Sequence, residues 1–216
     1  MSITSAVGTS FAIASTYGTA ATITAITNDN PAVATLSAAH GVIVGDIIEV
    51  TSGWDRLNGR LVRVSAVATN DVTLEGIDTS SVTNYPAGTG TGSVREITAW
   101  TQITQITADF AVTGGGQQYA DVTTLADRTQ KRIPTVRDPI DITLPLFDDP
   151  SLSWYSTVQT ASETATVTGV RIVFPNNSRL LANGYWSLQK TPTVSDSTLR
   201  GEISISLSAE PTRYAT

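Results

Sequence analysis

Strict alternation of apolar and polar side chains in the C-terminal half is the feature that most limits what this chain can fold into. From Ile140 to Leu146 every second residue is apolar, and Asp141 and Thr143 stand between them. A period of two places successive side chains on opposite faces of a β-strand. The pattern returns near the C-terminus, where apolar Ile203, Ile205 and Leu207 alternate with Glu202, Ser204, Ser206 and Ser208. The sequence therefore predicts a mainly β protein whose strands have one buried and one polar face.

One α-helix is predicted between these strands, over about residues 149–162. Leu152, Tyr155 and Val158 recur at helical spacing. Asp149 is the expected N-cap, and Pro150 suits the first helical position, where its missing N–H leaves no hydrogen bond unmade.

Sequence patterns in the N-terminal half indicate an arm, a small β module and a link. Residues 1–20 are small and polar and predict an extended arm with at most a short strand around Phe11–Ser15. Residues 21–81 hold about five short strand patterns, and Asn58-Gly59 is a strong hairpin signal, so a small β-barrel is expected. The run from Tyr85 to Gly92 is rich in glycine and predicts a flexible link. The expected organisation is an arm over 1–20, a β module with its link over 21–92, and a second β domain over 93–216.

The composition argues against several classes of function. Only 15% of residues are charged, and the net charge is −6. An acidic chain is a poor binder of phosphate backbones, which need clustered Lys and Arg. Cysteine is absent, which excludes disulfides and thiolate metal sites. The N-terminus lacks a signal-peptide pattern and no apolar run is long enough to span a membrane, so folding in a cytoplasm without membrane insertion is expected.

No residue pattern indicates catalysis, so no enzyme, cofactor or metal site is predicted. His40 is the sole histidine and is interpreted as a turn residue. Asp148 and Asp149 could form a carboxylate pair or a divalent-cation site, but the expected helix cap and turn account for them. The tryptophans are spread over four segments, which favours core or interface positions over a platform for bases.

One local basic patch leaves two interpretations open. It contains Arg128, Lys131, Arg132 and Arg137, within a segment (127–137) that predicts an exposed loop. The patch is either a solvated loop or one half of a salt-bridging contact with an acidic neighbouring subunit.

Short motifs in a fixed order resemble the tail tube proteins (major tail proteins) of long-tailed, non-contractile bacteriophages. They lie in the segments Trp100–Thr104, Asp121–Leu125, Arg132–Thr135, Ile140–Leu146, Asp148–Leu152, Trp154–Tyr155, Val173–Asn177, Asn183–Trp186 and Ser204–Ser208. Weaker likenesses at Ala38–Gly41, Gly45–Glu49 and Leu57–Gly59 extend the resemblance over most of the chain.

The resemblance implies a β-sandwich or half-barrel flanked by one helix, with the 21–92 module as an addition. It implies hexameric rings that stack into a hollow tube in the virion, assembled in the host cytoplasm. DNA would pass through the lumen without specific binding. The implied partners are copies of the chain and other tail proteins, namely the tape measure, the tail terminator and the distal tail protein.

Two surfaces are assigned on this basis. The polar strand faces are expected to line the lumen, although they could instead face outer solvent; their residues are Asp141, Thr143, Glu202, Ser204, Ser206 and Ser208. The arm over 1–20 and the loop over 126–137 are expected to mediate ring-to-ring contacts through Arg128, Lys131, Arg132 and Arg137. Competing interpretations are a cell-surface or secreted adhesion module and a carbohydrate-processing β-enzyme, the latter disfavoured by the lack of an acid pair.

Overall fold

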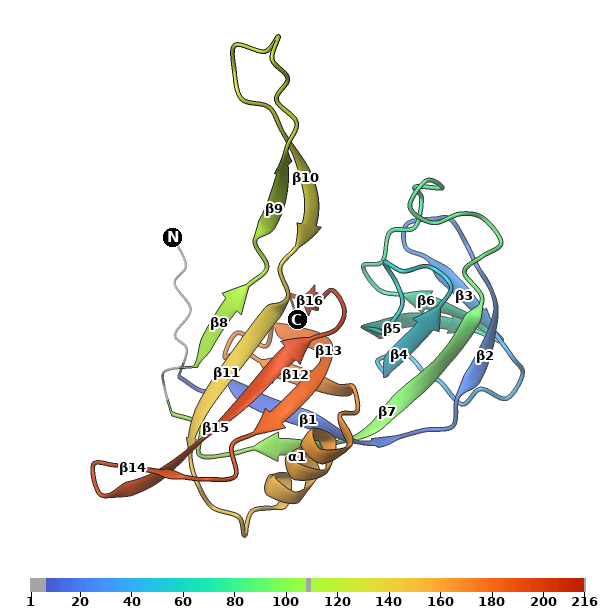
Figure 1. Cartoon of the computed structure of the whole chain (residues 1–216). Helices are drawn as coiled ribbons and strands as arrows, with labels where there is room; N and C mark the ends of the chain where they lie inside the picture. Colours follow the sequence, from blue (N-terminus) through green and yellow to red (C-terminus); the bar gives the residue numbers. More distant parts are fainter. Residues whose placement is uncertain (1–6, 108–109, 216) are drawn as a thin grey trace.

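The computed structural model describes residues 7–107 and 110–215, and within them the chain forms sixteen strands and one α-helix. About half of the residues are in strands, which confirms the predicted mainly β class. A single path of hydrogen-bonded strands runs through a small barrel and continues into a larger main sheet (Figure 1).

The barrel is closed by six antiparallel strands. Their order is β2-β3-β6-β5-β4-β7, and β2 also pairs with β7, which completes the ring. The barrel therefore has no free edge along this path, and edges are where strands aggregate. The strands are β2 (Ala21–Ile26), β3 (Val33–Leu36), β4 (Ile47–Ser52), β5 (Arg60–Ala68), β6 (Asp71–Leu74) and the first part of β7 (Gly92–Ile103).

The glycine-rich segment expected to be a flexible link packs against one end of the barrel. The indole N–H of Trp54 donates to the carbonyl oxygen of Pro86 at 2.9 Å and to the hydroxyl of Thr89 at 3.0 Å. Tyr85 meets the Trp54 ring edge-on, with centroids 5.2 Å apart. A Cβ on Gly90 would lie 2.8 Å from the Trp54 ring, so a glycine is needed there. The segment is part of the barrel rather than a free linker.

The main sheet continues from the second part of β7 in the order β7-β1-β12-β13-β15-β11-β8. Two short strands extend it, since β14 pairs with β15 and β16 pairs with β13. A separate two-stranded ribbon of β9 and β10 projects from it (Figure 1). These strands are β1 (Ser10–Tyr17), β8 (Ala111–Gly114), β9 (Gln117–Asp121), β10 (Arg132–Arg137), β11 (Ile140–Phe147), β12 (Thr168–Val173), β13 (Arg179–Leu188), β14 (Thr193–Ser195), β15 (Thr198–Leu207) and β16 (Thr212–Tyr214).

An extended arm is wrong for residues 10–17, where the short strand expected around Phe11–Ser15 is present and runs longer. They form β1, which lies between β7 and β12, with Phe11 opposite Ile103 on one side and Ile172 on the other. Phe11 and Ile13 are almost completely buried. Residues 1–6 of the expected arm lie outside the described residues. The burial of apolar side chains on both sides of β1 outweighs the polar composition that predicted an arm.

The helix α1 (Ser153–Thr164) starts later than predicted. Asp149 accepts hydrogen bonds from the backbone N–H of Ser151 at 3.0 Å and from its hydroxyl at 2.6 Å. Asp149 thus closes a turn ahead of the helix, and Leu152 occupies the N-cap position without a side-chain hydrogen bond. Trp154 and Val158 are buried against one face of the main sheet (Figure 1).

A mixed polar and apolar junction joins the barrel to the opposite face of the main sheet. Buried Asn183 on β13 donates to the Glu49 carboxylate at 3.0 Å and to the Gly59 carbonyl oxygen at 2.8 Å. Glu49 also pairs with Arg95 at 2.5 Å. Apolar side chains from both parts pack beside this network, among them Ile47, Leu61, Ile97 and Leu181. The division at residues 92 and 93 stays a prediction, because β7 begins there and serves both parts.

Candidate assembly surfaces

The main sheet is covered differently on its two faces. Ile142, Leu144 and Ile203 point toward α1 and are buried in the core. The other face is covered by the barrel only along β1, β12 and the start of β13, where the junction lies. Over β15, β11 and β8 this second face is open. The alternation read from the sequence therefore produces a polar, uncovered surface.

Strand register brings four of the six predicted lumen residues together on this open surface. Asp141 lies opposite Ser206, and Thr143 lies opposite Ser204. The same rows continue to Tyr185 and Ser187 on β13 and to Thr113 on β8. The residues of these rows line a shallow hollow of about 430 Å³. We refer to this surface as the polar face; its residues are Thr113, Asp141, Thr143, Tyr185, Ser187, Ser204 and Ser206.

Glu202 and Ser208 lie at the margins of the polar face. Glu202 stands opposite Pro145, one row further along, and its carboxylate accepts a 3.3 Å hydrogen bond from the Ser204 hydroxyl. Ser208 follows the end of β15, and its backbone N–H and hydroxyl both donate to the carbonyl oxygen of Asn183. Ser208 therefore closes the β13–β15 connection, whereas Glu202 extends the polar rows.

Sequence reasoning missed three members of the polar face. Tyr185 and Ser187 alternate with buried Trp186 and Leu188, so a period-two pattern was present on β13. Thr113 lies in a strand of four exposed residues with no apolar alternation to reveal it.

The ribbon, residues 117–137, is a two-stranded hairpin with little cover. Arg132 pairs with Asp121 and Ile133 with Ala120 across its strands. Every residue of β10 is exposed. The expected exposed loop is thus wrong for Arg132–Arg137, which form a strand. Side-chain hydrogen bonds from glutamine and threonine, such as Gln117 to the Thr135 carbonyl oxygen, stabilise the pairing locally.

The four basic residues predicted for inter-ring contacts divide between the two ends of the ribbon. Lys131 pairs with Asp127, and this hydrogen bond lowers the pKa of the Asp127 carboxyl. Arg132 donates to Gln130 at 3.2 Å. Arg128 makes no hydrogen bond or ion pair with the residues that the structure describes. These three lie toward the tip, while Arg137 lies at the base.

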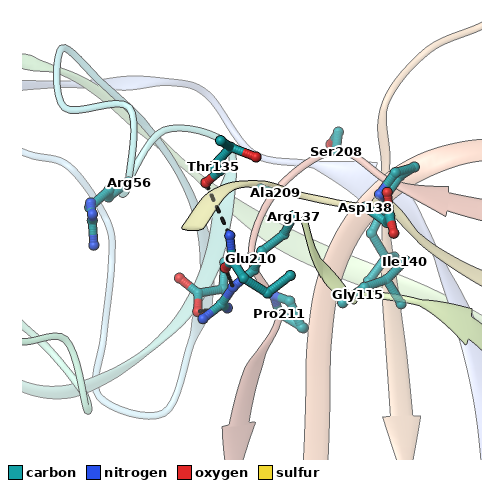
Figure 2. Close-up of a pocket in the computed structure, with 13 residues that line it drawn as sticks. Arg56, Gly115, Thr135, Arg137, Asp138, Ile140, Ser208, Ala209, Glu210 and Pro211 are labelled. Atoms are coloured by element: carbon teal, nitrogen blue, oxygen red, sulfur yellow. Dashed lines mark hydrogen bonds and ion pairs between the residues drawn. The ribbon is translucent and has the colours of Figure 1, made fainter. Parts of the chain in front are cut away.

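A hollow of about 510 Å³ lies at the base of the ribbon, between it, the loop after β15 and Arg56 of the barrel (Figure 2). The Glu210 carboxylate stands 3.9 Å from both Arg137 and Arg60. The long distances and the exposure of Glu210 make these weak pairs. The hollow joins three parts of the chain that are distant in sequence, so no local pattern could have revealed it.

The remaining candidate residues have structural roles. His40 accepts a hydrogen bond at Nδ1 from the Val42 N–H, which leaves Nε2 to donate to the Thr69 carbonyl oxygen at 3.0 Å. It therefore closes a turn, as predicted. Within residues 7–107 and 110–215 no group of three potential metal ligands of the His, Cys, Asp or Glu type is present. No helix in the described part of the chain is long and apolar enough to cross a membrane.

Comparison with known proteins identifies one family. Residues 52–216 match the family model described as phage tail tube protein, TTP. The match begins at the end of β4 and includes α1, the ribbon and most of the main sheet; β1 lies outside it. A search of curated proteins finds no match.

Proposed function

The chain belongs to the phage tail tube protein family, and from this premise we propose that its copies form hexameric rings that stack into a hollow tail tube for DNA delivery. The family is structural rather than enzymatic, so the protein is a structural component of the virion. The family also implies association with further copies and with other tail proteins. We place tape measure, tail terminator and distal tail proteins among those partners, with assembly in the host cytoplasm.

The polar face is the observation that carries this proposal. Rows of mostly small polar side chains cover the open part of the sheet, as any solvated sheet face requires. In a ring, six copies of this face would form a continuous inner wall. Its residues bear hydroxyl groups and the Asp141 carboxylate, with Glu202 at its margin, and they include no basic group. Such a wall repels phosphates, so DNA would slide rather than bind.

Ring closure needs a partner for the open edge of the main sheet. Strand β8 pairs with β11 on one side only, and its four residues are exposed. Unpaired edges are hazards in monomers and natural joints in assemblies. Of the two segments expected to stack rings, we retain the ribbon, because residues 10–17 of the expected arm form β1 inside the main sheet, with 11–14 buried.

Electron microscopy of the purified protein tests the assembly. Rings or tubes with a central channel are expected, and their fraction should rise with concentration in sedimentation experiments. A protein that stays monomeric at every concentration would instead support an adhesion module.

The lumen assignment has its own test. The double substitution Asp141→Lys and Glu202→Lys should change the free energy of unfolding by less than about 0.5 kcal/mol, because both side chains are at the surface. It should leave tubes intact and reduce infectivity by at least about tenfold, since a basic wall holds DNA phosphates. The control Asp55→Lys, with half the change in net charge, alters an exposed carboxylate on the barrel and should leave infectivity unchanged. Normal infectivity of the double variant would contradict the assignment.

A further inference from the structure

A pair of partly buried arginines, Arg171 and Arg179, lies on the main sheet beside the junction with the barrel. Strand β13 places Arg179 opposite Val173 of β12, two residues after Arg171. Opposite residues point to the same side of a sheet, so the two arginines are diagonal neighbours on one face, with Cβ atoms within about 8 Å. Leu181, opposite Arg171, packs in the junction, so this is the face that meets the barrel. Figure 1 shows β12 and β13 side by side.

Packing on an aromatic ring holds the side chain of Arg171. Its guanidinium carbon lies 4.7 Å from the centre of the Trp100 ring. Trp100 belongs to β7, and β1 lies between β7 and β12. On this face β1 carries Ala12 opposite Arg171 and Ala14 opposite Trp100, and these small side chains let the arginine lie across β1. A guanidinium fixed by stacking is already ordered before it binds a ligand, which lowers the entropic cost of binding.

The arginine pair has no acidic partner in the subunit. Neither side chain forms a hydrogen bond or an ion pair with the residues that the structure describes. Strands β1, β12, β13 and β16 and the loop over 174–178 contain no Asp or Glu. The carboxylates nearest in the fold belong to the barrel, where Glu49 pairs with Arg95 and Glu75 with Arg63. The strands around the pair therefore supply no counter-charge.

The unpaired arginines are electrostatically unfavourable in the free subunit. Burial, and after it repulsion from Arg179, lowers the pKa of the Arg171 guanidinium. The Nε atom of Arg171 is buried without a hydrogen-bond partner, whereas its two Nη atoms keep contact with solvent. The outer edge of the guanidinium is thus open to a ligand. An anion on that edge would relieve the repulsion and accept hydrogen bonds from both arginines.

We propose that Arg171 and Arg179 form a binding site for one oxyanion, a phosphate or a carboxylate. The planar guanidinium presents two donors that match two oxygens of either group, and such charge-assisted hydrogen bonds are stronger than neutral ones. Two sources offer this chemistry, namely free phosphate in solution and a carboxylate side chain of a second copy of the chain. The site is built within one subunit and does not depend on the proposed function.

Titration of free subunits with inorganic phosphate tests the site. The chain is labelled with nitrogen-15 and kept at a concentration at which sedimentation shows a monomer. NMR follows the arginine Nε–H signals, with sodium chloride at equal ionic strength as the reference. The signals of Arg171 and Arg179 should shift and saturate with phosphate but not with chloride. Arg171→Gln and Arg179→Gln, which also assign the two signals, should each weaken phosphate binding at least about tenfold, because one guanidinium is lost.

Two further variants separate the site from general charge and from misfolding. Arg128→Gln removes the same charge from an exposed arginine on the ribbon and should leave the affinity for phosphate unchanged. Arg171→Lys keeps the positive charge and the aliphatic stem over Trp100. It should give the circular dichroism spectrum of the unmodified chain and still bind phosphate more weakly, because an ammonium group lacks the planar fork.

The absence of a saturable shift at Arg171 and Arg179 would overturn the site. So would an affinity for phosphate that is equal in Arg179→Gln and Arg128→Gln.

Sedimentation at rising concentration distinguishes the two sources of the oxyanion. If a carboxylate of a second copy occupies the site, saturating phosphate and Arg179→Gln should both raise the concentration needed for assembly, relative to chloride at equal ionic strength. If free phosphate is the ligand, assembly should be the same in phosphate and chloride. A chain that never assembles would refute the proposed function, whereas phosphate binding to its free subunits would still support the site.

Discussion

At the residue scale, Tyr214 shows how one side chain near the C-terminus fixes the barrel to the main sheet. Its hydroxyl accepts a hydrogen bond from the Arg63 N–H at 2.8 Å and donates to the Glu75 carbonyl oxygen at 3.2 Å. Tyr214→Phe should lower the free energy of unfolding by about 1–2 kcal/mol, because it leaves two partly buried backbone groups without a partner. The matched change Tyr185→Phe, on the exposed polar face, should cost less than about 0.5 kcal/mol. Equal effects in urea denaturation would contradict this role.

The same residue predicts how stability responds to alkaline pH. Burial raises the pKa of the Tyr214 hydroxyl, while the hydrogen bond from Arg63 opposes the rise. The pKa of Tyr17 is likewise raised, first by burial. A raised folded pKa gives a contribution that is complete below the unfolded pKa of about 10 and is lost as pH rises toward the folded value. The free energy of unfolding should therefore fall above about pH 10, and less steeply in Tyr214→Phe. Parallel pH profiles of the two proteins would exclude this linkage.

At the element scale, we propose that the ribbon serves assembly rather than the stability of the subunit. Its residues contribute nothing to the buried core of the main sheet. The ribbon can be deleted without disturbing β8 or β11, because its two ends already lie side by side. The N–H of Asp138 donates to the Gly116 carbonyl oxygen at 2.9 Å. A chain that joins Gly116 directly to Asp138 keeps the pairing of β8 with β11.

This deletion should leave the melting temperature of the subunit nearly unchanged and abolish tubes. Calorimetry and electron microscopy measure the two effects separately. A large fall in melting temperature would mean that the ribbon supports the fold, and normal tubes without it would remove it from stacking.

At the scale of the whole molecule, the path of strands makes the barrel and the main sheet interdependent. Strand β1 supplies the centre of the main sheet although it precedes the barrel in sequence, and β7 belongs to both. A fragment of residues 93–216 lacks β1, so β7 and β12 would lose the strand between them. This fragment should not fold alone, in spite of holding α1 and most of the sheet.

A synthetic peptide of residues 8–18 should restore the fold of that fragment by filling the β1 position. Circular dichroism and tryptophan fluorescence report the recovery. A control peptide with Phe11→Ser and Ile13→Ser should not act, because both side chains are buried in the core. A fragment that folds without any peptide would show that β1 is dispensable and that the sequence-based boundary at residue 93 is sufficient.

The sequence by itself determined the features that depend on neighbours along the chain. The period of two from Ile140 to Leu146 predicted the strand β11. The helical spacing of Leu152, Tyr155 and Val158 predicted α1 to within one turn of its ends. The turn at Asn58-Gly59 likewise follows from the freedom of glycine, which has a φ of +74° there. These features could be predicted because local sterics and side-chain periodicity act between residues that are close along the chain, without any tertiary contact.

Only the tertiary structure decided which strands lie side by side and what covers them. Polar composition could not reveal that residues 10–17 fill the centre of a sheet, since their partners on β7 and β12 are far away in sequence. The glycine content between Tyr85 and Gly92 predicted a flexible backbone. Close packing also requires glycine, however, because a Cβ on Gly90 would collide with the Trp54 ring. The polar face, likewise, exists because register aligns rows from four strands. Pairing and register are set by the burial of apolar faces that are distant in sequence. The pattern of a single strand therefore does not reveal which strands lie beside it.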